Sequence, residues 1–267
     1  MMDVVYERCC GLDVHKDTIV ACILTGGRNK EIRSFGAMTN ELLTLIDWIK
    51  ENNCQCVAME STGSYWKPIY NLLEVEEIES MVVNAQHIKA VPGRKTDVKD
   101  AEWIANLLRH GLLKRSFIPK RDQRELRELV RYRKSIIEER SRELNRIQKV
   151  LEGANIKLSS VVSSIDCISA RNMLKALVEG KDDPLVLSSM AKGRLKGKQE
   201  ELKKALTGLI GRHQQMMLNE MLQHIEYLEG MVQRFRICLK KFNCDLSNGF
   251  RPGRRRMRLS GKSGSMV

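Results

Sequence analysis

Short apolar runs alternate with amphipathic segments over residues 7–111. Residues 7–24 hold two apolar runs on either side of the polar letters VHKDT, which predicts a β-hairpin with Asp13 near the end of its first strand. Further strands are predicted over 31–39, 54–62 and 79–85, and Glu60 lies at the end of the second of these. Apolar residues at helical spacing predict helices over 41–52, capped by Asn40, and over 64–76.

The segment KTDVKDAEWIANLLRHG, residues 95–111, predicts a third helix. Ala101, Ile104 and Leu108 form an apolar stripe that would pack this helix against the sheet. Asp97 and Asp100 are three residues apart and therefore lie on one face of the predicted helix. Acids are common in the first turn of any helix, so this pair alone does not define a site.

The predicted element order is β-β-β-α-β-α-β-α, which is typical of a ribonuclease-H-like α/β domain with a mixed sheet and helices on both faces. In that arrangement Asp13 and Glu60 end neighbouring strands, where α/β sheets place their ligands. The last helix would bring Asp97 and Asp100 to the same edge. Carboxylates that close together repel one another unless cations intervene, and oxygen ligands suit Mg²⁺ or Mn²⁺. We therefore expect a site for two such ions.

Beyond residue 113 the pattern becomes helical. Apolar residues recur near heptad spacing from Leu126 to Leu151, and a second long helix is predicted from about Gln199 to Phe242. A less regular polar segment with a turn at Asp183-Pro184 is expected between them. We interpret residues 114–245 as a coiled-coil-like helical hairpin that also pairs subunits, and residues 246–267, a basic tail without acids, as disordered.

Charge points to a polyanionic partner. The chain carries a net charge of +13, and residues 109–149 hold 14 Lys or Arg against 6 Asp or Glu. Basic residues also flank the last two acids of the proposed site, as expected for phosphate contacts. The predicted nucleic-acid contacts are Arg94, Lys95, Lys99, Arg127, Arg131, Arg133, Arg140, Arg142 and Arg146.

Neither export nor membrane insertion is expected. The sequence has no run of eighteen apolar residues and no signal-peptide pattern at its N-terminus. The eight cysteines lack CxxC spacing, so we interpret them as reduced, mostly buried thiols of a cytoplasmic protein.

Four segments together carry a family resemblance. GLDVHKDT, AMESTGSYWKPIYNLL, the region of PGRKTDVKDAEWIANLLRHGLL and the basic helix after it resemble the DEDD transposases, insertion-sequence recombinases with a RuvC-like catalytic domain. This group includes bridge-RNA-guided recombinases and is similar to the Piv DNA invertase. The resemblance covers residues 9 to about 242 and implies that Asp13, Glu60, Asp97 and Asp100 are the catalytic, metal-binding tetrad. It also implies element and target DNA, a guide RNA and a homo-oligomer, dimeric or tetrameric, as partners.

At its C-terminus the chain departs from the pattern of this family. Family members have a further domain with a serine thought to be the nucleophile, and it would begin near Phe242, where this chain continues into the arginine-rich tail. No nucleophile is therefore assigned. We interpret the domain order as a RuvC-like domain over 1–113, the helical region over 114–245 and an aberrant tail over 246–267, as in a truncated element.

Two other functions remain open on the sequence alone. The chain is alternatively a non-catalytic nucleic-acid-binding remnant that inhibits the full-length transposase, or a RuvC-like nuclease for DNA junctions or RNA. GLDVHKDT also resembles the first phosphate loop of sugar kinases and actin-like ATPases, but we find no second Gly-rich phosphate motif and set that class aside.

Overall fold

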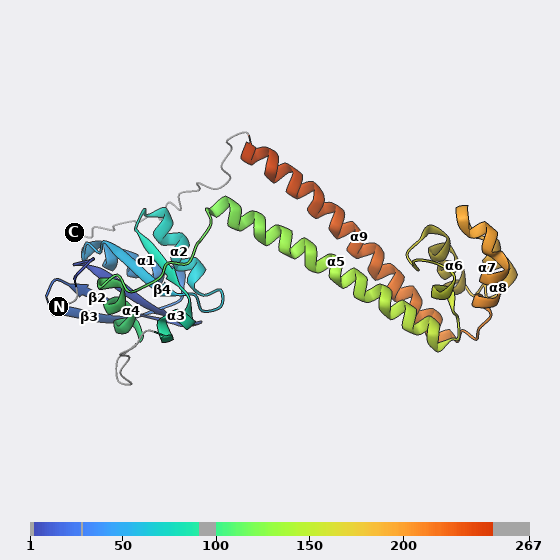
Figure 1. Cartoon of the computed structure of the whole chain (residues 1–267), viewed down its shortest axis with the longest axis horizontal. Helices are drawn as coiled ribbons and strands as arrows, with labels where there is room; N and C mark the ends of the chain where they lie inside the picture. Colours follow the sequence, from blue (N-terminus) through green and yellow to red (C-terminus); the bar gives the residue numbers. More distant parts are fainter. Residues whose placement is uncertain (1–2, 28, 91–99, 248–267) are drawn as a thin grey trace, which may run out of the picture. The chain divides into compact units, whose positions relative to one another are not determined.

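The computed structural model describes residues 3–27, 29–90 and 100–247. The chain divides into two compact units, here called the sheet unit, Met1–Ile118, and the helical unit, Pro119–Val267. Figure 1 shows strands and short helices in the first unit and long helices in the second.

A five-stranded mixed sheet forms the centre of the sheet unit, with strand order β3-β2-β1-β4-β5. The strand β1 pairs antiparallel with β2 and parallel with β4, and β4 pairs parallel with β5. This is the ribonuclease-H-like α/β arrangement expected from the sequence. The strands are β1 (Cys9–Val14), β2 (Thr18–Thr25), β3 (Asn29–Gly36), β4 (Cys56–Glu60) and β5 (Ser80–Val83).

Helices cover both faces of this sheet. On one face, α1 and α2 bury a core in which Leu45 and Leu73 meet Leu12 and Met59 of the strands. On the other face, α4 packs Ala101 and its apolar neighbours on Cys9 and Ala58. The helices of this unit are α1 (Thr39–Glu51), α2 (Trp66–Val75), α3 (Ala85–Ala90) and α4 (Asp100–Arg109).

Local structure at the helix starts differs from the sequence prediction. The helix α1 begins one residue before Asn40, its N-cap is Met38, and that residue makes no capping side-chain hydrogen bond. Instead the Glu41 carboxylate accepts a hydrogen bond from the backbone N–H of Gly36, so the acid in the first turn ties the helix to β3. The short helix α3 was not predicted, because its six residues are too few to show a helical period.

The helical unit contains two long antiparallel helices, α5 (Arg121–Gly153) and α9 (Arg212–Ser247), which pack along each other (Figure 1). This confirms the expected pair of long helices. The second begins later than predicted, because residues 199–206 form a separate helix and Thr207–Gly211 intervene. At Gly208, a Cβ atom would lie 2.5 Å from the Ala154 carbonyl oxygen, so only glycine permits this close approach.

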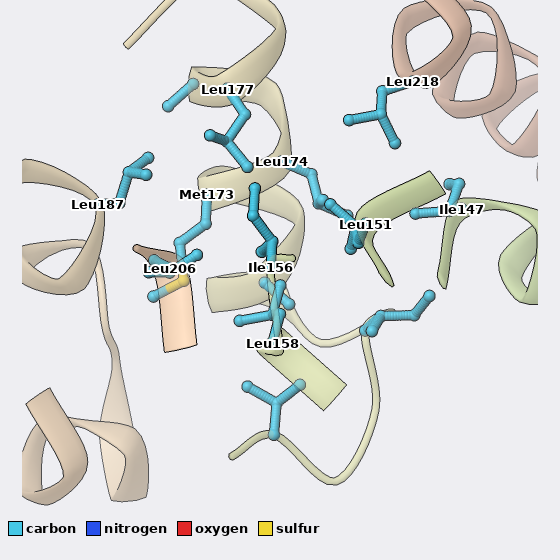
Figure 2. Close-up of a cluster of buried hydrophobic side chains, with 14 of the residues drawn as sticks. Ile147, Leu151, Ile156, Leu158, Met173, Leu174, Leu177, Leu187, Leu206 and Leu218 are labelled. Carbon is cyan, nitrogen blue, oxygen red and sulfur yellow. The ribbon is translucent and has the colours of Figure 1, made fainter. Parts of the chain in front are cut away.

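The connector between the long helices is folded, which corrects the prediction of a less regular polar segment. It forms a compact subdomain, here called the cap, whose apolar side chains join those of both long helices in one core. Figure 2 shows Met173, Leu174 and Leu177 of α6 facing Ile156 and Leu206 in this core. The cap elements are η1 (Leu158–Ser160), α6 (Ile168–Val178), α7 (Pro184–Ser189), η2 (Gly193–Lys198) and α8 (Gln199–Leu206).

The predicted turn at Asp183-Pro184 is a helix start. The Asp183 carboxylate accepts a hydrogen bond from the Leu185 N–H at 2.9 Å, and Pro184 occupies the first position of α7. Proline fits there because the first backbone N–H groups of a helix have no intrahelical partner.

Two arginines and two carboxylates join the cap to the long helices. Arg140 of α5 pairs with Asp166 and, at 2.7 Å, with Glu229 of α9. Arg171 of α6 pairs with the same two acids, at 2.5 Å for Asp166. The hydrogen bond from Arg171 is the main reason that the pKa of Glu229 lies at about 2, below the ordinary 4.5, although partial burial acts in the opposite direction. The two positive and two negative charges compensate one another, and the cluster links the cap to both long helices.

Replacing Glu229 by Gln should lower the free energy of unfolding of the helical unit by about 2 kcal/mol near pH 6, since a hydrogen bond to a charged group contributes roughly that much. The folded-state pKa is depressed, so this stabilisation is complete above pH 4.5 and is lost as the pH falls toward about 2. The difference between wild type and Glu229→Gln should therefore shrink over that range.

Urea unfolding followed by circular dichroism at pH 6, 4 and 3 measures this difference. Glu226→Gln is the matched control, because Glu226 pairs with Lys175 at 2.7 Å through two side chains that are more than half exposed. It should cost about 0.5 kcal/mol or less. A constant difference between wild type and Glu229→Gln across this range would contradict the account.

Candidate active site at the carboxyl ends of the central strands

Asp13 and Glu60 occupy equivalent positions on adjacent parallel strands. Leu12 pairs with Met59 across β1 and β4, and the two acids are the next residue on each strand. Neighbouring strands are about 5 Å apart, so the two carboxylates begin from backbones at that separation. Side chains alternate along a strand, which places both acids on the face of the sheet that Gly11 and Ala58 present to α4.

The helix α4 runs antiparallel to β1 on that face. Near its C-terminal end, the Arg109 carbonyl accepts a hydrogen bond from the Val5 N–H at 2.8 Å, before β1 begins. Its middle lies over Cys9, whose thiol is 3.5 Å from the Ala105 carbonyl oxygen. Its N-terminal end must therefore lie toward the carboxyl end of β1, where Asp13 and Glu60 are found.

The approach of α4 depends on Gly11. A Cβ atom on Gly11 would lie 2.3 Å from the Ala101 carbonyl oxygen and 2.4 Å from the Ala105 nitrogen, both of which are backbone atoms that cannot turn away. The missing side chain lets the first turn of α4 rest on β1. Asp100, the first residue of α4, immediately precedes Ala101 and is thus carried to the edge of the sheet that holds the other two acids.

Two polar neighbours contact the strand-end acids. The Thr62 hydroxyl donates a hydrogen bond to Glu60 Oε1 at 3.0 Å. His15 Nε2 lies 3.1 Å from Asp13 Oδ2. The Asp13 side chain is 19% exposed and is therefore accessible from solvent. The sequence prediction did not include Thr62, although its place two residues after a strand-end acid is a signal that would have indicated it.

The predicted site residues are only partly within the described chain. Asp13, Glu60 and Asp100 lie at one edge of the sheet, whereas Asp97, Arg94, Lys95 and Lys99 lie outside the described residues. Within residues 3–27, 29–90 and 100–247, no three His, Cys, Asp or Glu side chains are close enough together to hold a metal ion as they stand. The donor set itself suits a hard cation, because all three acids offer carboxylate oxygens and Mg²⁺ and Mn²⁺ prefer oxygen ligands.

The cysteines buried in the strands are not candidate nucleophiles. All eight are free thiols, and four of them are buried in the strands. Burial raises the pKa of Cys9 to about 12 and that of Cys22 to about 11, so both stay protonated and inert near neutral pH.

The predicted arginines of α5 fall on different faces of that helix. Residues 127, 131 and 142 fall within about 60° of one another at 3.6 residues per turn, and all three arginines are exposed. Arg140 belongs to the ion-pair cluster with the cap, Arg146 pairs with Glu143 at 2.5 Å, and Arg133 is half-buried. Among the described helices, none is long and apolar enough to span a bilayer.

Comparison with known proteins defines the class. Residues 10–156 match the model of the IS110 DEDD transposase family, described as a transposase. That match covers more than half of the chain, and the chain belongs to this family.

A relative in Sinorhizobium fredii (strain NBRC 101917 / NGR234), named "Putative transposase y4qE", is 31% identical over 140 residues. The alignment covers 49% of this chain and 35% of the relative, so the chain spans about a third of that protein's length.

Gly11→Ala should destabilise the sheet unit by about 3 kcal/mol, the upper end of the usual cost of overpacking, because α4 must move off β1. Thermal unfolding followed by tryptophan fluorescence isolates this unit, since all three tryptophans, Trp48, Trp66 and Trp103, lie in it. Gly26→Ala is the control, because a Cβ at Gly26 meets nothing within 4 Å. Equal melting temperatures for the two variants would show that α4 does not depend on Gly11.

Proposed function

We propose that this chain carries the catalytic domain of an insertion-sequence transposase, which uses a carboxylate-bound divalent cation to cut or exchange DNA strands. One observation carries the proposal: parallel pairing of β1 with β4 and antiparallel packing of α4 bring Asp13, Glu60 and Asp100 to one edge of the sheet. Membership of the transposase family supports DNA as the substrate.

In this proposal, Asp13, Glu60 and Asp100 hold Mg²⁺ or Mn²⁺ together with Asp97. Such ions, when bound, polarise a phosphodiester and stabilise the leaving oxygen. The protein's own contribution is to fix the oxygen donors. Strand pairing fixes the backbones of Asp13 and Glu60, the Thr62 hydroxyl orients Glu60, and the packing of α4 on Gly11 fixes Asp100. The positive N-terminal end of α4 also favours negative charge at this edge.

Nucleic-acid backbone contacts are proposed for the exposed face of α5. Arg127, Arg131 and Arg142 make no ion pair with any residue that the structure describes, so their charges are available to phosphates. Here we call this set the α5 face. Arg140 is left out of the proposal, because its guanidinium is held by Asp166 and Glu229. Arg94, Lys95 and Lys99 stay in the proposal on sequence grounds, as neighbours of the acids.

The remaining partners are proposed from the family resemblance. They are element-end and target DNA, a guide RNA, and further copies of the chain in a homo-oligomer. The long helices offer the surface for pairing, since Val130, Tyr132 and Ile237 are each about half or more exposed there.

Glu60→Gln should weaken Mn²⁺ binding by about 100-fold or more, because loss of an outer-shell partner alone typically costs about 10–100-fold. The fold should be retained, since the substitution removes repulsion between neighbouring carboxylates. Calorimetric titration with Mn²⁺ measures the affinity, and nicking of supercoiled DNA by the same samples measures the activity.

Glu51→Gln is the matched control, because Glu51 is an exposed carboxylate on α1, away from the strand ends. Mn²⁺ binding that survives in Glu60→Gln at wild-type affinity would exclude Glu60 as a ligand. If the wild type binds metal but does not nick DNA, the proposal that this chain cleaves DNA strands is wrong.

Thr62→Val should weaken Mn²⁺ binding about tenfold, because Glu60 loses the hydrogen bond that orients it. Thr62→Ser keeps the hydroxyl and should restore the wild-type affinity. The side chain is exposed, so neither variant should change the melting temperature by more than about a degree or two. If Thr62→Ser binds Mn²⁺ as weakly as Thr62→Val, the hydroxyl has no positioning role.

A further inference from the structure

A dense group of cations lies on the cap. Between residues 192 and 204 the chain has six Lys or Arg and two Glu. Four of the cations, here called the cap patch, are on and just before η2, and all four side chains are exposed. Among described residues, Lys198 alone of the four has an ion-pair partner, Glu201, at 3.8 Å. The cap patch consists of Lys192, Arg194, Lys196 and Lys198.

The backbone beneath this patch is fixed. The Lys192 N–H donates a hydrogen bond to the Ser169 hydroxyl at 2.9 Å, and that serine is itself buried at the start of α6. Leu195, between two of the cations, packs against the core of the helical unit. The charges are therefore displayed by an anchored turn, which reduces the entropy lost when a ligand binds.

The patch is also sterically open. A Cβ at Gly193 or at Gly197 would meet nothing within 4 Å. Gly193 has φ of +58°, which favours glycine, but Gly197 is not in the left-handed region and no neighbour requires its lack of a side chain. Gly197 lies among these cations, and its missing side chain leaves room for a ligand to approach the backbone closely.

A hollow of about 360 Å³ adjoins the patch and is lined by Lys175, Lys181 and Lys192, among others. The first two lysines are paired with Glu226 and Glu179, each at 2.7 Å. Lys192 is therefore the cation of this hollow that has no acid partner among the described residues.

We propose that the cap patch binds the sugar-phosphate backbone of a nucleic acid without reading its bases. Lys and Arg suit phosphates, and the patch offers no aromatic side chain for stacking on bases. The choice of nucleic acid as the polyanion rests on the proposed function. The proposal adds a second contact site on the cap, distinct in sequence from the α5 face.

The test compares three triple variants of the full chain that each remove three positive charges. The cap variant is Arg194→Gln, Lys196→Gln and Lys198→Gln. The face variant is Arg127→Gln, Arg131→Gln and Arg142→Gln. The control variant is Arg8→Gln, Lys50→Gln and Lys114→Gln, three exposed cations of the sheet unit that belong to neither surface.

Fluorescence anisotropy measures binding to a 30-nucleotide RNA and to a 30-base-pair DNA duplex over a series of salt concentrations. Each lost phosphate contact lowers the slope of log affinity against log salt by about 0.9 for duplex and about 0.7 for single strands. In the cap variant this slope should fall by about two units on at least one of the two probes. The fall should be the same for probes of unrelated base sequence. The control variant should change the slope by less than about one unit. The probe that shows the loss identifies the source of the phosphates.

Several outcomes overturn the proposal, and they can be told apart. If the cap variant matches the control variant on both probes while the slope falls in the face variant, the cap patch does not bind nucleic acid, and the proposed function is unaffected. If the wild-type chain binds neither probe, both the cap contact and the proposed function are excluded. Loss of binding to anionic phospholipid vesicles in the cap variant, with unchanged nucleic-acid binding, would assign the patch to a membrane surface instead.

Discussion

The sheet unit depends on one close backbone contact, the packing of α4 against β1 at Gly11. A side chain at that position would overlap the Ala101 carbonyl and the Ala105 nitrogen. Because α4 lies this close, its apolar stripe closes the second core of the sheet, and its first residue lies at the strand ends. The same contact thus serves stability and the placement of an acid, so packing and the proposed chemistry cannot be changed independently.

The helical unit is held together in a different way. The cap adds to the two long helices a shared core in which α5, α6, α8 and α9 all take part (Figure 2). The cluster of Arg140, Arg171, Asp166 and Glu229 then links the cap to both helices. Positive charges that do not take part in such pairs remain exposed, on the α5 face and on the cap patch. We infer that the cations held in this cluster have a structural role, and that the exposed cations of the α5 face and the cap patch have binding roles.

Much of the sheet unit was predictable, because its strands are short apolar runs and Asp13 and Glu60 end two of them. The order of the strands followed from the element order, and the structure confirms the mixed sheet. The role of Gly11 was not predictable, since a glycine in a strand does not reveal which backbone approaches it. The cap was also missed, because helices as short as α7 show no clear period and their core includes residues of five other elements. The roles of the arginines were not predictable, because they depend on partners distant in sequence. Arg140, for example, pairs with Glu229, and the pattern of residues along one helix does not indicate such a partner.

The position of a bound Mn²⁺ ion tests the account most directly, and anomalous diffraction from crystals soaked in Mn²⁺ would locate it. The account predicts anomalous density at the carboxyl ends of β1 and β4, between the Asp13 and Glu60 carboxylates and the first turn of α4. Density elsewhere on the chain, with none at this edge at saturating Mn²⁺, would contradict the assignment of these acids as the metal site.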